Sequence, residues 1–218
     1  MSAPCILILG GSFDPVHTGH VGLAHYCATL LHPDVLRLIP AGQPWQKPEL
    51  ATPATHRMAM LKLAFADCAI PVQFDDQEIC RTTPTYTIDT LRALRAELGE
   101  KVSIVLAMGA DQLINLHTWH HWQQLFDYAH LCVATRPGFL LTQDTPTAEV
   151  AREITRRKAS AAQLRATPNG LVYLADNLAL DVSATTIRQA LQQDNNTDEL
   201  LPRAVLDYIH QHHLYKIN

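Results

Sequence analysis

The chain has 218 residues, of which 47% are hydrophobic and 17% are charged, a composition typical of one soluble globular domain spanning residues 1–218. Its formal net charge of −4 argues against an extended surface for nucleic-acid polymers and favours a small nucleotide as partner. No apolar run approaches a membrane span, and the apolar N-terminal run is too short for a signal peptide, so we expect a cytoplasmic protein without a membrane partner.

A turn rich in glycine and histidine separates the first predicted strand from the first predicted helix. The aliphatic run 5–9 predicts a buried strand, and apolar residues between 21 and 31 predict a helix. Between them, Gly10 and Gly11 would let a bulky anion approach the main chain at the start of the helix. His17 and His20 are three residues apart, so both imidazoles are expected on one face. An ordinary turn with solvated histidines is the alternative, and the combined motif disfavours it.

A second predicted strand, 34–40, ends in a loop that contains Lys47. Ligands of open α/β sheets bind beyond the carboxyl ends of the strands, so Lys47 is a candidate phosphate contact, although a solvated lysine is the simpler interpretation of the composition. A helix is predicted from about 55 to 67, which places Arg57 near its start. The run 71–74 predicts a short strand.

Threonines and a proline precede the next periodic segment, in which Ile88, Leu91, Leu94 and Leu98 repeat at helical spacing. This pattern predicts a helix capped by the hydroxyls of residues 82–87. The free N–H groups at such a helix start suit a carboxylate or a phosphate.

The buried strand predicted at 102–108 ends in Gly109-Ala110-Asp111, a third strand end with a glycine and a carboxylate. Trp119 and Trp122 follow, and their spacing alone favours the core over a ligand site. Neither the histidines nor the cysteines predict a metal site, because the histidines lack a cysteine or acidic third ligand. The histidines in question are His117, His120 and His121. The cysteines, expected to be reduced and mostly buried, are Cys5, Cys27, Cys68, Cys80 and Cys132.

The last third of the chain contains a second candidate anion site. A strand at 131–134 leads to a turn with Arg136, and residues 140–169 predict a peripheral segment with a helix at 149–154 and a solvated face of cations at 152–158. Strands are predicted at 171–174 and 178–182. Ser183 and Thr185 then begin a helix that carries Arg188 on its first turns, which suits an anion. This C-terminal helical piece, about 184–216, includes a last helix near 202–213.

Several of these segments together resemble the signatures of a known family. The sequence of residues 11–20, GSFDPVHTGH, resembles the G-x-F-D-P-x-H-x-G-H signature of the nucleotidyltransferase superfamily, in its bacterial nicotinate mononucleotide adenylyltransferase form. Residues 40–47 resemble its P-x-G-x-P-x-x-K loop, 85–91 its S/T-Y-T-x-D-T-L segment, 109–122 its G-A-D…L-x-x-W segment, 136–138 its R-P-G turn and 182–188 its I-S-S-T-x-I-R signature. Val182 and Ala184 depart from the last signature, and Ala184 removes one hydroxyl.

The resemblance implies an α/β fold with a Rossmann-like doubly wound parallel sheet, of the nucleotidyltransferase α/β phosphodiesterase type. It implies transfer of AMP from ATP to nicotinate mononucleotide in NAD biosynthesis, with Mg²⁺ bridging the phosphates. Catalytic roles are implied for His17, His20 and Arg188. The implied ATP contacts are Gly10, Gly11, Ser12, Phe13, His17, His20, Gly109, Asp111, Arg136, Ser183, Thr185 and Arg188. The implied contacts to the mononucleotide are Asp14, Lys47, Thr85, Tyr86, Thr87 and Trp119.

Two other functions stay open on the sequence. The same turn could serve another acceptor, such as nicotinamide mononucleotide or phosphopantetheine, although Thr85 to Thr87 and Trp119 favour the nicotinate compound. The second open function is that of a nucleotide-binding regulator without catalysis, and the intact His17, His20 and Arg188 argue against it. The sequence also leaves open whether the chain forms a homo-oligomer.

Overall fold

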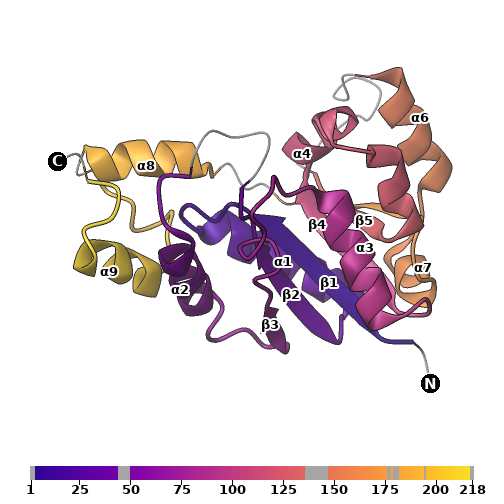
Figure 1. Cartoon of the computed structure of the whole chain (residues 1–218), viewed down its shortest axis with the longest axis horizontal. Helices are drawn as coiled ribbons and strands as arrows, with labels where there is room; N and C mark the ends of the chain where they lie inside the picture. The colour runs from indigo at the N-terminus through magenta and orange to yellow at the C-terminus, as the bar shows by residue number, and fades with distance from the viewer. Residues whose placement is uncertain are drawn as a thin grey trace. The chain divides into compact units, whose positions relative to one another are not determined.

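The computed structural model describes residues 3–43, 50–135, 147–175, 178, 182–193 and 195–216 (Figure 1). Six strands form one sheet in the order β3-β2-β1-β4-β5-β6. The strands are β1 (Cys5–Gly11), β2 (Val35–Pro40), β3 (Val72–Phe74), β4 (Ser103–Gly109), β5 (His130–Ala134) and β6 (Val172–Ala175). This is the strand order of a doubly wound α/β sheet, so the predicted fold class is confirmed.

Helices and short 3-10 turns connect the strands. They are α1 (Thr18–Leu31), α2 (Ala54–Ala64), α3 (Thr87–Leu98), α4 (Ala110–Ile114), η1 (Leu116–Thr118), η2 (Trp122–Asp127), α6 (Ala148–Arg157), α7 (Ala161–Ala166), α8 (Ala184–Gln192) and α9 (Arg203–Gln211). The chain thus alternates strands with helices, as parallel sheets require. No helix among the described residues is long and apolar enough to cross a membrane.

The central strands pair in parallel, with Cys5 of β1 opposite Ser103 of β4 and Val105 of β4 opposite His130 of β5. β5 pairs in the same direction with β6. Every residue of β5 is buried, and β4 is buried from Ser103 to Met108. Strands that are covered on both faces have continuous apolar sequences, so the sequence predicted the positions of β4 and β5 well.

The chain forms two compact units. The first comprises Met1–Leu9, Leu23–Arg37 and Tyr86–Ala179, and the second comprises Gly10–Gly22, Leu38–Thr85 and Leu180–Asn218. In the second unit α2 lies beside α9 (Figure 1). Buried Met60 and Leu61 of α2, and buried Val205 and Ile209 of α9, supply the apolar faces of these helices. The C-terminal helices therefore belong to the same unit as the histidine-containing turn.

A buried arginine joins several backbone segments of the first unit. Arg95 of α3 is 4% exposed, and its guanidinium donates to the carbonyl oxygens of Gly99 (2.9 Å), Val102 (2.7 Å), Tyr128 (2.7 Å) and Pro168 (2.9 Å). The five fixed donors of a guanidinium allow one side chain to serve so many acceptors. Burial lowers the pKa of Arg95 from its usual value.

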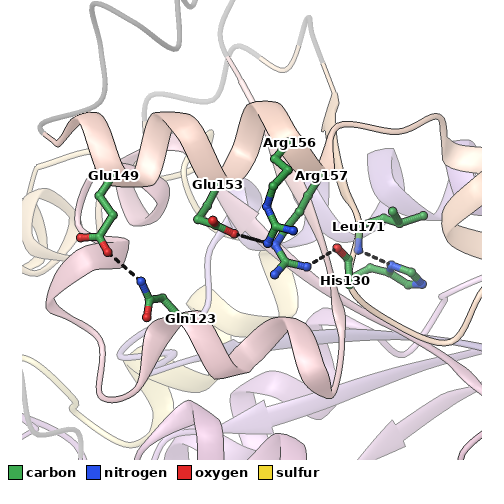
Figure 2. Close-up of polar contacts among 8 residues, drawn as sticks. Gln123, His130, Glu149, Glu153, Arg156, Arg157 and Leu171 are labelled. Atoms are coloured by element: carbon green, nitrogen blue, oxygen red, sulfur yellow. Dashed lines mark hydrogen bonds and ion pairs between the residues drawn. The ribbon is translucent and has the colours of Figure 1, made fainter.

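The segment expected to be peripheral is anchored in the first unit where the structure describes it. Val150 and Ile154 of α6 and Leu164 of α7 are fully buried. Figure 2 shows Glu149 accepting from Gln123 at 2.7 Å and Glu153 accepting from Arg157 at 3.0 Å. The predicted helix at 149–154 is confirmed within α6, whereas α7 was not predicted.

The prediction of a solvated cationic face at 152–158 was wrong for Arg157. Its side chain is 21% exposed, its guanidinium lies 4.2 Å from the centre of the Phe126 ring, and it donates to the carbonyl of Gly170 at 2.9 Å. The side chain of Arg156 is 62% exposed, as expected of the face. An arginine can pack its aliphatic chain and guanidinium plane against the protein while a neighbouring arginine stays in water. The charge of the residue does not show which of the two environments it has.

One further local prediction differs from the structure. The residue before α3 is Tyr86, which makes no side-chain capping bond, and the hydroxyl of Thr85 bonds instead to the carbonyl of Gln43 at 3.3 Å. The segment after Gly109 is divided among α4, η1 and η2, and His121 adopts a left-handed backbone with φ 49°. The predicted strand at 178–182 lies almost wholly outside the described residues.

Candidate active site

Two stacked histidines mark the turn between β1 and α1. The rings of His17 and His20 have centroids 3.7 Å apart at an angle of 30°, which confirms that both imidazoles share one face. The backbone N–H of His17 donates to Nδ1 of His20 at 3.3 Å. A neutral His20 with an accepting Nδ1 carries its proton on Nε2.

His17 is the buried member of the pair. It is 7% exposed, and burial lowers its pKa to about 4, so the ring is neutral near pH 7. Its Nδ1 has no hydrogen-bond partner among the described residues. A buried polar atom without a partner is uncommon in folded proteins and is often explained by a ligand or by catalysis.

Glycine at position 19 allows His17 to lie against the backbone of α1. A Cβ atom at Gly19 would meet Nδ1 of His17 at 2.9 Å and Cε1 at 3.0 Å. Such distances are shorter than ordinary side-chain contacts, so a larger residue would displace the ring. The glycine of the His-x-Gly-His pattern therefore has a steric reason that the sequence alone did not supply.

The preceding residues of the turn are buried and held by hydrogen bonds. Phe13 is fully buried with φ 48°, a left-handed conformation that is strained for a non-glycine residue. Asp14 is 2% exposed; its Oδ2 accepts from the backbone N–H of Ala51 at 2.8 Å and its Oδ1 from the hydroxyl of Tyr215 at 2.7 Å. The carboxylate of Asp14 thus has partners within the protein for both oxygens.

Two arginines contact the backbone of this turn. Arg57 of α2 is 2% exposed and donates to the carbonyl of Ser12 at 2.8 Å and, through Nε, to that of Thr52 at 3.2 Å. Burial lowers its pKa, an effect that nearby Asp14 partly offsets. Arg188 of α8 donates to the carbonyl of Asp14 at 2.6 Å. Two cationic groups from distant parts of the sequence therefore lie at one short turn.

The start of α8 presents hydroxyl and amide groups to solvent. Ser183 and Thr185 are exposed, and the Ser183 side chain makes no capping hydrogen bond to the helix. Thr185 Oγ1 lies 3.4 Å from Nη2 of Arg188. Unsatisfied N–H groups, hydroxyls and a guanidinium at a helix start form an anion-binding arrangement. In the second unit, the turn and α8 together offer imidazole, guanidinium and amide donors suited to a polyphosphate.

The remaining predicted ATP residues of the first unit lie where β4 passes into α4. Gly109 is the N-cap of α4, and a Cβ atom there would lie 2.5 Å from Oδ1 of Asp111. Asp111 is exposed, and its Oδ2 accepts from the Gln112 side chain at 2.7 Å. The glycine thus leaves room for the carboxylate to fold back over the strand end.

The predicted mononucleotide residues of the first unit include two aromatic side chains. Trp119 is partly buried, and its Nε1 is a buried donor with no partner among the described residues. Trp122, in contrast, is 8% exposed and belongs to the core. Tyr86 lies beside His120 with ring centroids 4.6 Å apart, next to Thr87 at the start of α3. Thr85 is counted with the second unit and is 5% exposed.

Two predicted site residues, Lys47 and Arg136, lie outside the described residues. Two contacts to the turn were not predicted as such: the sequence suggested Arg57 only by its position, and it gave no indication of Tyr215. Both act through backbone or carboxylate partners far away in the sequence, with Tyr215 and Asp14 separated by 201 positions. A single sequence carries no periodic signal for such pairs.

Comparisons with known proteins identify the family of the chain. A family model described as cytidylyltransferase-like matches residues 8–190. A protein of Herminiimonas arsenicoxydans named "Probable nicotinate-nucleotide adenylyltransferase" is 58% identical over 212 residues, covering 97% of each chain. A protein of the same name from Serratia proteamaculans is 40% identical, covering 96% of this chain and 94% of its own.

A solved structure supports the same fold. The Plasmodium falciparum nicotinic acid mononucleotide adenylyltransferase complexed with NaAD has a TM-score of 0.74 and 18% identity, covering 97% of both chains. At this identity the likeness concerns the fold, whereas the sequence relatives identify the family. The chain belongs to the nicotinate-nucleotide adenylyltransferases of the cytidylyltransferase-like family.

Proposed function

We propose that the protein transfers AMP from ATP to nicotinate mononucleotide, giving nicotinate adenine dinucleotide and pyrophosphate. The observation that carries this proposal is the stacked His17–His20 pair on a turn whose backbone also receives Arg188. The names of the full-length relatives supply the acceptor. Among solved structures of the same fold, one is described as complexed with NaAD and another with the ligand APC.

The reaction needs positioning and charge stabilisation rather than a covalent enzyme intermediate. A phosphate oxygen of the mononucleotide attacks the α-phosphorus of ATP, and the bond from that phosphorus to the bridging oxygen breaks as pyrophosphate leaves. The attacking phosphate is already an adequate nucleophile. Donors fixed where negative charge increases therefore supply the catalysis.

Different residues of the second unit position the phosphates and stabilise their charge. Nε2–H of His20 donates to a phosphate oxygen of ATP, and the neutral His17 supports it by stacking and offers its buried Nδ1. Arg188, with Ser183, Thr185 and the free N–H groups of α8, holds the β and γ phosphates and the departing pyrophosphate. Gly10 and Gly11 let the phosphates approach the main chain at the end of β1, and Ser12 and Phe13 complete the turn.

The proposed roles of the first-unit residues follow from their sequence patterns. Gly109 and Asp111 at the end of β4 bind ATP. Trp119 packs against the pyridine ring, and the backbone at Tyr86 and Thr87 binds the nicotinate carboxylate with the free N–H groups of α3, to which Thr85 leads. On their sequence patterns, Lys47 contacts a nucleotide phosphate and Arg136 contacts ATP.

Magnesium accompanies ATP in this proposal and neutralises phosphate charge during the transfer. The donor set of the turn fits a cation held through phosphate oxygens and water. The one carboxylate of the turn, that of Asp14, already accepts from Ala51 and Tyr215, and the other side chains offer imidazole, guanidinium and hydroxyl groups. Mg²⁺ keeps several waters in such sites and needs few protein ligands.

Measuring pyrophosphate release from ATP with each acceptor tests this function. Purified protein with Mg²⁺ is given nicotinate mononucleotide, nicotinamide mononucleotide or phosphopantetheine, and we expect the highest kcat/KM with the first. A higher value with another acceptor would replace the substrate. ATP binding in calorimetry without pyrophosphate release from any acceptor would point to a regulator and overturn the enzymatic proposal.

A further inference from the structure

Asp14 joins three segments of the second unit, two through its carboxylate and one through its backbone carbonyl. Its Oδ2 accepts from Ala51, which precedes α2, its Oδ1 accepts from Tyr215, which follows α9, and its backbone carbonyl accepts from Arg188 of α8. All three distances lie between 2.6 and 2.8 Å. Asp14 lies three residues before His17, so the position of this buried residue determines the path of the chain into the histidine pair.

The hydroxyl of Tyr215 is a donor that the buried carboxylate needs. Asp14 is 2% exposed, and a carboxylate removed from water must be compensated by hydrogen bonds. Burial raises the pKa of the Tyr215 hydroxyl well above its usual value, so the group remains protonated and donates. The short O–H to carboxylate bond of 2.7 Å belongs to the strong, charge-assisted class.

The backbone on both sides of this contact is strained. Phe13, the neighbour of Asp14, has φ 48°, and Tyr215 itself has φ 64°, both in the left-handed region that side chains with a Cβ disfavour. Such conformations persist where surrounding contacts fix them and are found preferentially at functional sites. The tail also bonds back to its helix, because Leu214 N–H donates to the carbonyl of Ile209 at 3.0 Å.

We propose that Tyr215 is a positioning residue of the adenylyl transfer, which holds the carboxylate of Asp14 and thereby fixes the turn that carries His17 and receives Arg188. The inference rests on the proposed function, and it adds to it a residue outside every recognised motif of the chain. Tyr215 touches no reacting atom. Its effect reaches the reaction through Asp14, in the alignment of the donors that stabilise the transferred phosphate.

Tyr215→Phe removes one hydroxyl and keeps the ring, so it isolates the hydrogen bond. The matched control is Tyr208→Phe on α9, which removes the hydroxyl that lies 3.0 Å from Nδ1 of His56 and leaves Asp14 untouched. Misaligned transition-state donors lower kcat more than ground-state binding, so we expect kcat to fall roughly 10-fold for Tyr215→Phe with both KM values within about 2-fold. Tyr208→Phe should stay within about 2-fold of the wild type in kcat.

A double-mutant cycle with Asp14→Asn tests whether Tyr215 acts through Asp14. Groups that act as one unit are non-additive, so the double variant should be little slower than Asp14→Asn alone. Unchanged kcat in Tyr215→Phe overturns the proposal. Equal losses in Tyr215→Phe and Tyr208→Phe also overturn it, because they would indicate general packing of α9, and so do additive losses in the cycle.

A measurement without turnover separates this proposal from the proposed function. The Hε1 resonance of His17, assigned by His17→Gln, should shift in the folded full-length Tyr215→Phe protein and stay in place in Tyr208→Phe. If the wild type releases no pyrophosphate but this pattern appears, the function fails and the positioning stands. If the wild type is active but the resonance and kcat are both unchanged in Tyr215→Phe, the positioning fails and the function stands.

Discussion

The imidazole rings of His17 and His20 are stacked with centroids 3.7 Å apart, and the backbone N–H of one residue donates to the ring of the other. Two imidazolium ions at this distance would repel each other. Burial lowers the pKa of His17 to about 4, which leaves this ring neutral at the pH at which metabolic enzymes work. In the proposed reaction the pair therefore serves as fixed dipoles and donors, with His17 supporting His20.

The first prediction concerns the protonation of His17. Its Hε1 resonance should titrate near pH 4 in the folded protein and near the ordinary value of 6.5 in urea. Because the folded pKa is lower, the unfolded chain takes up the proton first as the pH falls. The contribution of His17 to stability is thus complete above about pH 6.5 and is lost as the pH falls towards 4. The loss in the free energy of unfolding is roughly 3 kcal/mol. A folded-state midpoint near 6.5 would contradict this.

The second prediction concerns His20. Replacing it by alanine removes a donor proposed to act on the transferred phosphate, and loss of one such donor typically lowers kcat by about 10²-fold or more. We expect at least this loss in pyrophosphate release, with an unchanged circular dichroism spectrum. His25→Ala, an exposed position on the same helix, is the control and should keep normal turnover. A His20→Ala enzyme with near-normal turnover would remove His20 from the mechanism.

The third prediction concerns Gly19. Glycine to alanine inside a helix ordinarily stabilises by up to about 1 kcal/mol. Here the added methyl would lie 2.9 Å from Nδ1 of His17. We expect Gly19→Ala to shift the His17 resonance and lower kcat, with no gain in the free energy of unfolding measured by urea denaturation. A more stable and fully active variant would show that the ring can move without cost.

The fourth prediction concerns the buried Arg95. A lysine has one ammonium and cannot reach four carbonyl oxygens at once, so Arg95→Lys leaves buried acceptors without donors. We expect a loss of about 2–4 kcal/mol in the free energy of unfolding, by analogy with other broken buried networks. Arg92→Lys is the control on the same helix, because its side chain is 43% exposed; it should lower the free energy of unfolding far less than Arg95→Lys does. Equal losses would contradict the role of Arg95.

Where burial produces a continuous pattern, the sequence predicted the fold closely. The predicted runs 5–9, 102–108 and 131–134 correspond to β1, β4 and β5 within two residues, because strands covered on both faces are uniformly apolar. The helix after Ser183 was predicted as well, from hydroxyls at its start. Both patterns are local in the sequence, so a single chain displays them.

Features that depend on distant partners were missed. The contacts of Arg95 and Tyr215 join residues up to 73 and 201 positions apart, and neither side chain differs in the sequence from a solvated one. Arg157 was misjudged for the same reason, since only the Phe126 ring and the Gly170 carbonyl distinguish it from Arg156. The candidate site residues were predicted from their sequence patterns, whereas their contacts with Arg57 and Tyr215 became visible only in three dimensions.

The bond between Asp14 and Tyr215 also orders events during synthesis on the ribosome. The histidine turn is made before the residues that hold Asp14 and receive Thr18, because these residues lie 174 to 201 positions later. Translation proceeds at about 5–20 residues per second, so the C-terminal partners of the turn follow it after roughly 10–40 seconds. A growing chain therefore acquires its strands well before it can become an active catalyst.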